Sequence, residues 1–431
     1  MFYKHFCERM SSPIRAMLTL SFGTAVAKLC VLLSMPVLTR IYTPAHFSYY
    51  SLFTSIVVVA APLMTLRYSL AIPLARRDEV AFNLSVFCLF LVAVSSIILS
   101  VILSFLWPTL IQGVVAADGS LLWQVVVAGC VASAVYEVLA MWASRKQAYS
   151  SSARSQVLSA VVGESGKVSS GLAGAQGIGL VAGHILGQIV SSLMLIRVFG
   201  PEFWRLSGTI SQSKMSFTAS YYRDFLIWRM PSQLLQGLAF RGPVFYFATV
   251  FGSNATGYLG LAMMALSLPI TLIANNAGNA LYAEAARMGR RARSEIREIA
   301  KDTVKKLSIL SFVPGVALML SGPALFSFIF GKEWEVAGEF ASIMSVSLIF
   351  QFVASPITKL LNIFGDQKLI FYLDAQRTII VISVFLVSYY KDLDPRQVLY
   401  IFSGAIALHY LVALFVVFRA LRVPVHNRSK S

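Results

Sequence analysis

The sequence has few charged residues for its length. Only 13% of its 431 residues are Asp, Glu, Lys or Arg, whereas 57% are hydrophobic, and the mean hydropathy is +0.72. Soluble domains of this total size need far more polar surface to cover them. The composition therefore excludes a soluble enzyme, a DNA-binding domain and a disordered scaffold, and it predicts a membrane protein.

Acidic residues are especially scarce. The 19 Asp and Glu are outnumbered by 36 Lys and Arg, which gives a formal net charge of +17. In a soluble protein this balance would favour nucleic-acid binding, but the cytoplasmic loops of membrane proteins also carry an excess of Lys and Arg. We therefore expect no nucleic-acid partner, and we attribute most of the charge to topology and to attraction by anionic membrane lipid.

Motifs of metal binding and catalysis are lacking as well. The four cysteines, Cys7, Cys30, Cys88 and Cys130, form no CxxC pair and have no His at metal-ligand spacing. The sequence has no Walker loop, no nucleophile elbow, no HExxH motif and no paired carboxylates at an inner interface. It therefore predicts no metal site, no cofactor and no catalytic residues.

Long apolar runs, by contrast, fill most of the chain. A hydrocarbon core about 30 Å thick needs roughly 20 apolar residues of helix, and a scan for such runs predicts twelve transmembrane helices. They cover residues 16–38, 47–67, 82–106, 121–142, 155–174, 178–197, 225–250, 257–281, 307–330, 337–357, 369–390 and 398–418. The first run has no cleavage site of the signal-peptide type and is interpreted as a retained helix. The fifth and eleventh runs contain charged residues and also fit surface segments.

The distribution of cations favours all twelve. With both termini in the cytoplasm, 28 Lys and Arg fall in cytoplasmic segments, four in outer loops and four within helices. Without the fifth helix, the segment 287–306 and its eight cations would lie outside, against the positive-inside rule. We therefore predict an all-α polytopic membrane protein with two six-helix bundles around a central cavity.

The predicted domains are an amino-terminal bundle at 1–205, a cytoplasmic linker at 206–224, and a carboxy-terminal bundle with its tail at 225–431. Two bundles in the same orientation are consistent with a parallel internal repeat. A faint similarity supports the repeat, because IYTPAHFSYYSL after the first helix aligns with VFGSNATGYLGL after the seventh.

We single out seven ionisable residues of the predicted spans, because such groups inside a membrane usually face a partner or a wet cavity. They are Lys28, Glu137, Glu164, Lys167, His184, Arg229 and Arg241. The four cations exceed the two carboxylates, so a cavity lined by these residues suits a doubly anionic ligand such as a pyrophosphate diester. Arg229 also fits an interfacial position, which makes Arg241 the stronger candidate of the two.

Several of these residues have more than one interpretation. Lys28 either lines the cavity or snorkels to the interface. Glu164 and Lys167 are spaced i,i+3 and either neutralise each other or serve the cavity, with Lys167 on substrate and Glu164 titrating. Glu137 has no cation within one helical turn, so it must reach another helix or be protonated in a dry site. It is the first candidate for ion coupling.

Other polar residues follow helical spacing. His184, with Gln188 and Ser191, fits either a helix-packing set of hydrogen bonds or a proton relay. Asn275 and Asn279 continue a stripe of polar residues at every fourth position of the eighth helix. That stripe is either an interhelical seam or a cavity wall that faces sugar.

Three segments resemble a known family. PVLTRIYTPAHFSYYSL at 36–52, LRYSLAIPLARRDEVAFNL at 66–84 and the stretch from PSQLLQGLAFRG to LYAEAA at 231–286 are similar to the polysaccharide-transport branch of the multidrug/oligosaccharidyl-lipid/polysaccharide exporter superfamily. Members often have an acidic residue after an Arg-Tyr pair, whereas Ser69 follows Arg67 and Tyr68 here. This leaves Arg67 without a local partner. Either Arg67 is freer to meet a lipid phosphate at the cytoplasmic mouth, or the local packing simply differs.

The resemblance implies a flippase of the bacterial inner membrane, of the O-antigen or exopolysaccharide type. Such a protein moves undecaprenyl-pyrophosphate-linked oligosaccharide from the cytoplasmic to the periplasmic leaflet by alternating access, and it works with a polysaccharide polymerase and a chain-length regulator. The cationic cavity would comprise Lys28, Arg67, Lys167, Arg229 and Arg241.

Two alternatives remain. One is a drug or solute antiporter of the same superfamily. The other is a membrane glycosyltransferase or polymerase of the same pathway, which is disfavoured because the sequence offers no sizeable loop that bears acid and base groups.

Overall fold

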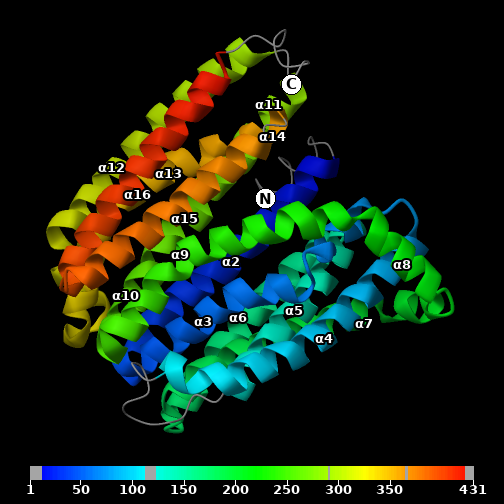
Figure 1. The fold of residues 1–431 in the computed structure, drawn as a ribbon, viewed down its shortest axis with the longest axis horizontal. Coiled ribbons are helices and arrows are strands. Elements are labelled where there is room, and N and C mark those ends of the chain that lie inside the picture. Colours follow the sequence, from blue (N-terminus) through cyan, green and yellow to red (C-terminus); the bar gives the residue numbers. More distant parts are fainter. Residues whose placement is uncertain (1–11, 112–122, 290–291, 365–366, 423–431) are drawn as a thin grey trace, which may run out of the picture. The chain divides into compact units, whose positions relative to one another are not determined.

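The computed structural model describes residues 12–111, 123–289, 292–364 and 367–422 (Figure 1). Within these ranges the chain is built of helices and contains no strand. Ten helical stretches of the described chain are long and apolar enough to cross a membrane. The predicted all-α membrane fold is thus confirmed.

The long helices follow one another with short connections. In chain order they are α2 (Ser12–Ile41), α3 (Pro44–Met64), α4 (Asp78–Ile111), α5 (Trp123–Arg145), α6 (Tyr149–Leu172), α7 (Gln176–Ser207), α8 (Gln212–Tyr221), α9 (Met230–Val250), α10 (Gly252–Pro269), α11 (Asn275–Met288), α12 (Arg293–Phe330), α13 (Glu335–Thr358), α14 (Leu361–Phe364), α15 (Gln367–Tyr390) and α16 (Pro395–Ala420). Between them lie the 3₁₀ segments η1 (Tyr68–Leu74) and η4 (Lys332–Trp334) and the π-helical segments η2 (Phe225–Arg229) and η3 (Ile270–Ala274).

Each of the twelve predicted spans coincides with helix. The helices α6 and α9 are not among these ten stretches. The helix α6 carries Glu164 and Lys167, and α9 carries two glutamines and Arg241. A total of twelve membrane crossings therefore stays a prediction. The second predicted span ends too late, since the helix α3 stops at Met64.

The chain divides into two compact units. The first comprises Met1–Gly237 with Ala248–Gly257, and the second comprises Leu238–Phe247 with Tyr258–Ser431. Residues of α9 thus contribute to both. The predicted division into bundles at 1–205 and 225–431 stays a prediction, and α8 gives part of the expected linker a helical conformation.

In the first unit, α6 packs against both α2 and α7, and α5 packs against α3, α4 and α7. Glycines allow α6 and α7 to approach closely. A Cβ atom on Gly183 of α7 would lie 2.7 Å from the carbonyl oxygen of Gly163, and one on Gly187 would lie 2.7 Å from that of Ser159. Small residues at such crossings are typical of membrane helices, where close backbone packing replaces the hydrophobic effect.

In the second unit, α13 packs between α12 and α16, and it also contacts α11. Aromatic rings fill the space beside α15. The ring of Phe385 stacks on that of Tyr246 at 4.6 Å and on that of Phe402 at 5.9 Å between centroids. The two aligned segments of the suspected repeat begin α3 and α10, which follow α2 and α9 directly.

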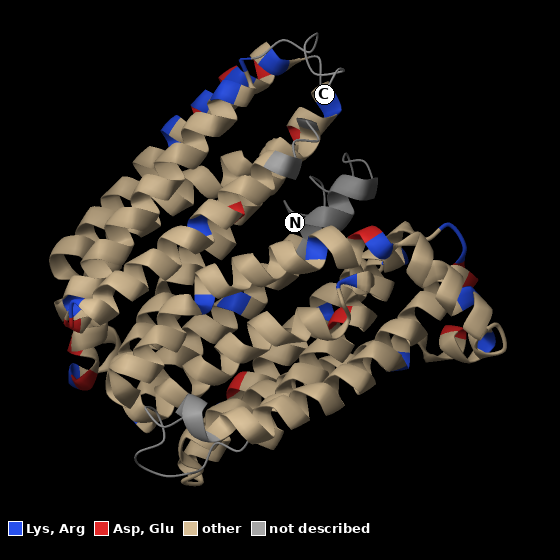
Figure 2. Cartoon of the chain, viewed as in Figure 1, with Lys and Arg blue, Asp and Glu red and all other residues tan. Residues whose placement is uncertain are grey.

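Charge and exposed apolar surface are separated along the helices. Lys and Arg gather mainly near helix ends, and the middles of the helices show few charges (Figure 2). Large apolar side chains are exposed on α4 and α12, including Ile97, Phe105, Leu320 and Phe328. Apolar side chains in such positions suit contact with lipid chains, as expected of a membrane protein.

Candidate functional site

The first polar cluster is built where α3 ends. Leu66 and Arg67 have left-handed backbone conformations, with φ of 47° and 62°, which non-glycine residues adopt uncommonly and which often mark functional positions. This turn ends α3 and starts η1 at Tyr68. It places Arg67 and Ser69 beside the middle of α5.

Arg67 has partners on two helices. Its Nη1 donates to Oε1 of Glu137 on α5 at 3.1 Å, and its Nη2 donates to Oε1 of Gln233 on α9 at 2.9 Å. Ser69 Oγ donates to the same Glu137 oxygen at 2.8 Å. Arg67 thus has no acidic partner beside it in the sequence, as expected, but a carboxylate from α5, 70 residues away, compensates its charge.

The same contacts revise the view of Glu137. It does reach beyond its own helix, as one of the two interpretations required, and it is paired with a cation. The side chains of Arg67 and Glu137 are 15% and 20% exposed, so this ion pair is partly but not fully buried. Glu137 is thus not an isolated carboxylate, and any role in coupling must involve Arg67.

The second cluster lies deeper in the first unit. Lys167 Nζ donates to Oε1 of Glu164 at 2.6 Å and to the hydroxyl of Tyr50 at 3.0 Å. Ser34 Oγ of α2 donates to the other Glu164 oxygen at 2.7 Å. The side chain of Lys167 is 3% exposed and that of Glu164 is 11% exposed. The i,i+3 pairing, one of the two interpretations of the sequence, is present, and neighbouring helices add hydroxyl groups to it. A role of Lys167 and Glu164 in the cavity stays a prediction.

His184 borders this second cluster. Its ring meets the rings of Phe53 and Tyr50 edge-on, with centroids 5.5 and 6.2 Å apart. Farther along α7, Ser191 Oγ donates to the carbonyl oxygen of Ser155 on α6 at 2.9 Å. Ser191 therefore takes part in helix packing, while the proton-relay role of His184 stays a prediction.

The remaining predicted cations of the first unit are more exposed. Lys28 lies on an exposed part of α2, one turn after Thr24, which donates to Oε1 of Gln156 on α6 at 2.7 Å. Arg229 ends the π segment η2 and is also exposed. Contact of either residue with substrate stays a prediction.

Arg241 belongs to the second unit. Its guanidinium lies 5.3 Å from the ring centroid of Phe240, and Arg377 of α15 lies 5.9 Å from the same ring. Arg377 also lies 5.6 Å from the ring of Tyr410. Such distances are typical of cation–π contacts. The sequence did not single out Arg377, and its aromatic environment is visible only in the structure.

A lysine from another part of the second unit contacts the polar stripe of the eighth predicted helix. Lys359, directly after α13, donates from Nζ to the backbone oxygen of Asn275 at 3.2 Å and to Oδ1 of Asn279 at 2.9 Å. Ser267 and Thr271 donate within their own helix. Lys359 thus contacts Asn275 and Asn279 of this stripe, whereas the hydroxyl groups of Ser267 and Thr271 bond to nearby backbone oxygens.

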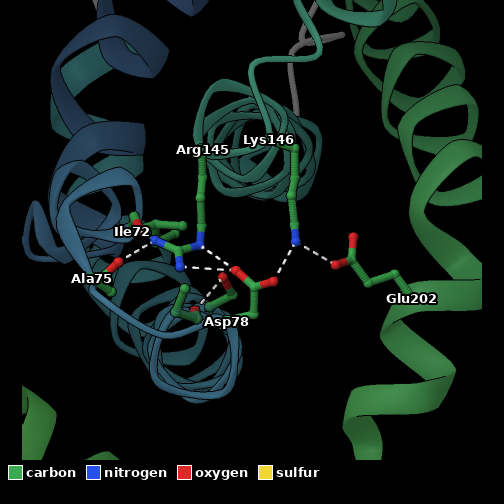
Figure 3. Close-up of polar contacts among 8 residues, drawn as sticks. Ile72, Ala75, Asp78, Arg145, Lys146 and Glu202 are labelled. Atoms are coloured by element: carbon green, nitrogen blue, oxygen red, sulfur yellow. Dashed lines mark hydrogen bonds and ion pairs between the residues drawn. The ribbon is translucent and has the colours of Figure 1, made fainter.

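A further network, around Asp78, was not predicted from the sequence. Arg145, at the end of α5, donates from Nη2 to Oδ1 of Asp78 at 2.9 Å, and it also donates to the backbone oxygen of Ala75. Lys146 lies 2.6 Å from Oδ2 of Asp78 and 2.5 Å from Oε1 of Glu202 on α7 (Figure 3). Burial lowers the pKa of Lys146, but the hydrogen bonds that Lys146 donates to the carboxylates of Asp78 and Glu202, together with their negative charges, outweigh it and raise that pKa. This network ties α4, α5 and α7 together at one end of the first unit.

The described residues hold no group of three or more His, Cys, Asp and Glu that could bind a metal ion. Cys30, Cys88 and Cys130 are free thiols, and Cys7 lies outside the described residues. The cationic groups of Arg67, Lys146 and Lys167 are paired with carboxylates. An anion that binds such a cation would have to displace its carboxylate.

Comparisons with known proteins place this geometry in context. A family model described as "Polysaccharide biosynthesis protein" matches residues 37–339. A comparison with curated protein sequences gives no match.

Solved structures share the fold over nearly the whole chain. The lipid II flippase MurJ, in an inward closed conformation, is 12% identical, with a TM-score of 0.68 over 95% of this chain and 90% of that one. An inward-facing multidrug resistance MATE family transporter of the MOP superfamily is 15% identical, with a TM-score of 0.67 over 94% of this chain and 95% of that one. A MOP superfamily transporter from Pyrococcus furiosus is 15% identical, with a TM-score of 0.64 over 96% and 97%. The chain thus has the fold of MOP superfamily transporters.

Proposed function

The chain belongs to the polysaccharide biosynthesis protein family, and we propose that within it the protein is a flippase for an undecaprenyl-pyrophosphate-linked oligosaccharide. The substrate would be an O-antigen or exopolysaccharide repeat unit, moved from the cytoplasmic to the periplasmic leaflet. The observation that carries the proposal is the family match across residues 37–339. Support comes from the fold, which is shared with a flippase of another lipid-linked saccharide, lipid II.

The cations of the spans would recognise the pyrophosphate. A diphosphate offers several anionic oxygens, which suit the fork of an Arg and the point charge of a Lys. We assign this role to Lys28, Arg67, Lys167, Arg229 and Arg241. Asn275 and Asn279 would line the polar wall of the cavity, while the polyprenyl chain stays in the bilayer.

The Arg67–Glu137 pair suggests how substrate and a driving ion would be linked. When a phosphate binds the guanidinium of Arg67, it competes with the carboxylate of Glu137, which lies 3.1 Å from Nη1. Glu137, released from Arg67, is then open to a proton or another cation. Coupling through Glu137 would follow from this exchange, and Glu164 and His184 are the other candidates for the coupled site.

The proposal includes a location and a mode of action. The protein would lie in the bacterial inner membrane with both termini in the cytoplasm, as the distribution of Lys and Arg predicts. Alternating access would expose a central cavity to each side of the membrane in turn. A polysaccharide polymerase and a chain-length regulator would act on the flipped product.

A drug or solute antiporter is the second candidate. The observation in its favour is the fold, since the multidrug transporter matches nearly as well as the flippase does. The excess of cations over carboxylates in the spans argues against an organic cation as cargo. A glycosyltransferase or polymerase stays a more distant alternative, because the solved relatives are transporters and flippases.

Deletion of the gene in its host tests the proposal. We expect lipid-linked repeat units to accumulate with their sugars in the cytoplasmic leaflet, surface polysaccharide to be lost, and both defects to be reversed by the gene in trans. Normal surface polysaccharide together with increased drug sensitivity would instead support the antiporter.

A further inference from the structure

We infer that Lys359 and Asn279 form a binding site for a phosphoryl anion in the second unit, beside the end of α13. For the identity of its ligand, the inference rests on the proposed function, which supplies a lipid-linked diphosphate. The geometry itself points only to the phosphoryl group. An anionic membrane phospholipid carries the same group and is the second source to be tested.

The two residues are held together by direct contacts. Lys359 Nζ donates to Oδ1 of Asn279 at 2.9 Å and to the backbone oxygen of Asn275 at 3.2 Å. An ammonium group has three N–H donors, so these two bonds leave one donor for a ligand. The Asn279 oxygen is occupied by Lys359, which turns the amide nitrogen and its two donors away from the lysine. Together the pair offers a positive charge and several N–H donors, and a phosphoryl group accepts from such donors.

Lys359 differs from Lys167 and Arg67 in how its positive charge is compensated. Lys167 and Arg67 each have a carboxylate partner at 2.6 and 3.1 Å. Both acceptors of Lys359 are neutral, and no Asp or Glu of the described chain forms an ion pair with it. Since Lys359 is partly buried, its positive charge favours an anionic ligand, which would supply the negative charge that no described Asp or Glu provides.

The backbone fixes the spacing of the two residues. Gly278 of α11 packs on Pro356 of α13, and a Cβ atom on this glycine would lie 2.9 Å from Pro356 Cα and 3.1 Å from Lys359 Cδ. The π segment η3 ends at Ala274, immediately before Asn275, and π segments inside helices are frequent at functional sites. The close contact of α11 with α13 therefore brings donors from two helices to one place.

A purely structural role for Lys359 would look similar in a single mutant. A cation that follows α13 also interacts favourably with the carboxyl-terminal end of that helix. The two roles differ in their response to a new negative charge at residue 279. Asn279→Asp gives Lys359 a carboxylate partner, which would strengthen a structural contact but would neutralise an anion site.

The experiment measures binding of undecaprenyl diphosphate and, separately, of phosphatidylglycerol to the purified full-length protein in detergent. We compare the wild type with Asn279→Asp, Lys359→Gln and Lys359→Arg. Lys306→Gln is the matched control, because Lys306 lies in the same unit, is exposed and pairs with Asp302. Melting temperature is recorded for every variant, so that affinity and folding are separated.

We expect Asn279→Asp to melt no lower than the wild type and to bind the diphosphate roughly tenfold or more weakly, as for the loss of a charge-assisted hydrogen bond. Lys359→Gln should show the same loss, Lys359→Arg should keep part of the affinity, and Lys306→Gln should match the wild type. A wild-type affinity in Asn279→Asp and in folded Lys359→Gln would overturn the inference and leave the proposed function standing. If the loss occurs with phosphatidylglycerol while the wild type does not bind the diphosphate, the phosphoryl site stands and the proposed substrate is contradicted. Binding of neither lipid by the wild type would contradict both.

Discussion

The carboxylate of Glu137 accepts hydrogen bonds from both Arg67 and Ser69, at 3.1 and 2.8 Å to the same oxygen. Ser69 stands where related sequences often have an acidic residue. In this chain the negative charge that meets Arg67 therefore comes from another helix, α5, and the serine hydroxyl supports it. Arg67, Ser69 and Glu137 thus form one arrangement of charge and hydroxyl groups.

This arrangement predicts a rescue. Glu137→Gln should lower the free energy of unfolding by about 1–3 kcal/mol, because Arg67 loses its charged partner. Adding Ser69→Glu to that variant should recover most of the loss, since it returns a carboxylate next to the guanidinium. Thermal unfolding of the purified proteins in detergent measures both effects.

The matched control for this rescue is Ser69→Glu alone. It places a second carboxylate beside Glu137 and should destabilise the protein through repulsion of like charges. A double variant that is less stable than Glu137→Gln would contradict the account of this cluster.

The pair formed by Glu164 and Lys167 predicts that the stability of the protein depends on keeping both charges or removing both. Lys167→Met leaves a buried carboxylate without its cation and should cost about 3–5 kcal/mol. The double variant Glu164→Gln with Lys167→Met should be more stable than that single variant, because it leaves no charge behind. Folded yield and melting temperature measure this difference, and equal losses in the two variants would show that the ion pair does not govern stability here.

The sequence allowed the helical fold to be predicted, because lipid demands long apolar helices and these are visible as runs of residues. It also allowed the Glu164–Lys167 pair to be predicted, since both members lie on one helix. It did not allow the partner of Arg67 to be predicted, because Glu137 is 70 residues away and only the packing of η1 on α5 brings the two together. Lys359 was missed for the same reason, as its contacts with Asn275 and Asn279 depend on how α13 approaches α11.

The network around Asp78 predicts a difference between two neighbouring acidic residues. Asp78 accepts from Arg145 and Lys146, whereas Glu79 pairs with the exposed Lys214 at 3.1 Å. Asp78→Asn should therefore lower the melting temperature clearly, while Glu79→Gln should change the free energy of unfolding by less than about 1 kcal/mol. Similar losses in both variants would contradict the structural role of this network.

Glycine packing between α6 and α7 predicts a further contrast. Gly183→Ala should destabilise the first unit, because the new Cβ atom would meet the Lys167 side chain and the backbone of Gly163. Gly200→Ala, later in the same helix, should be neutral or slightly stabilising, since nothing lies within 4 Å of its Cβ position. Melting temperatures test the pair, and a tolerant Gly183→Ala would mean that α6 and α7 are packed less closely than described.

The most direct test of the flippase proposal is a transport measurement with purified protein in liposomes. Lipid-linked oligosaccharide is placed in the inner leaflet, and its appearance outside is followed with a glycosidase that cannot cross the membrane. The account predicts that vesicles with the wild-type protein expose the oligosaccharide, and that vesicles with Arg241→Ala, at equal amounts of folded protein, expose it more slowly. Oligosaccharide that stays protected in wild-type vesicles to the same extent as in protein-free vesicles, under imposed proton and sodium gradients alike, would contradict the account.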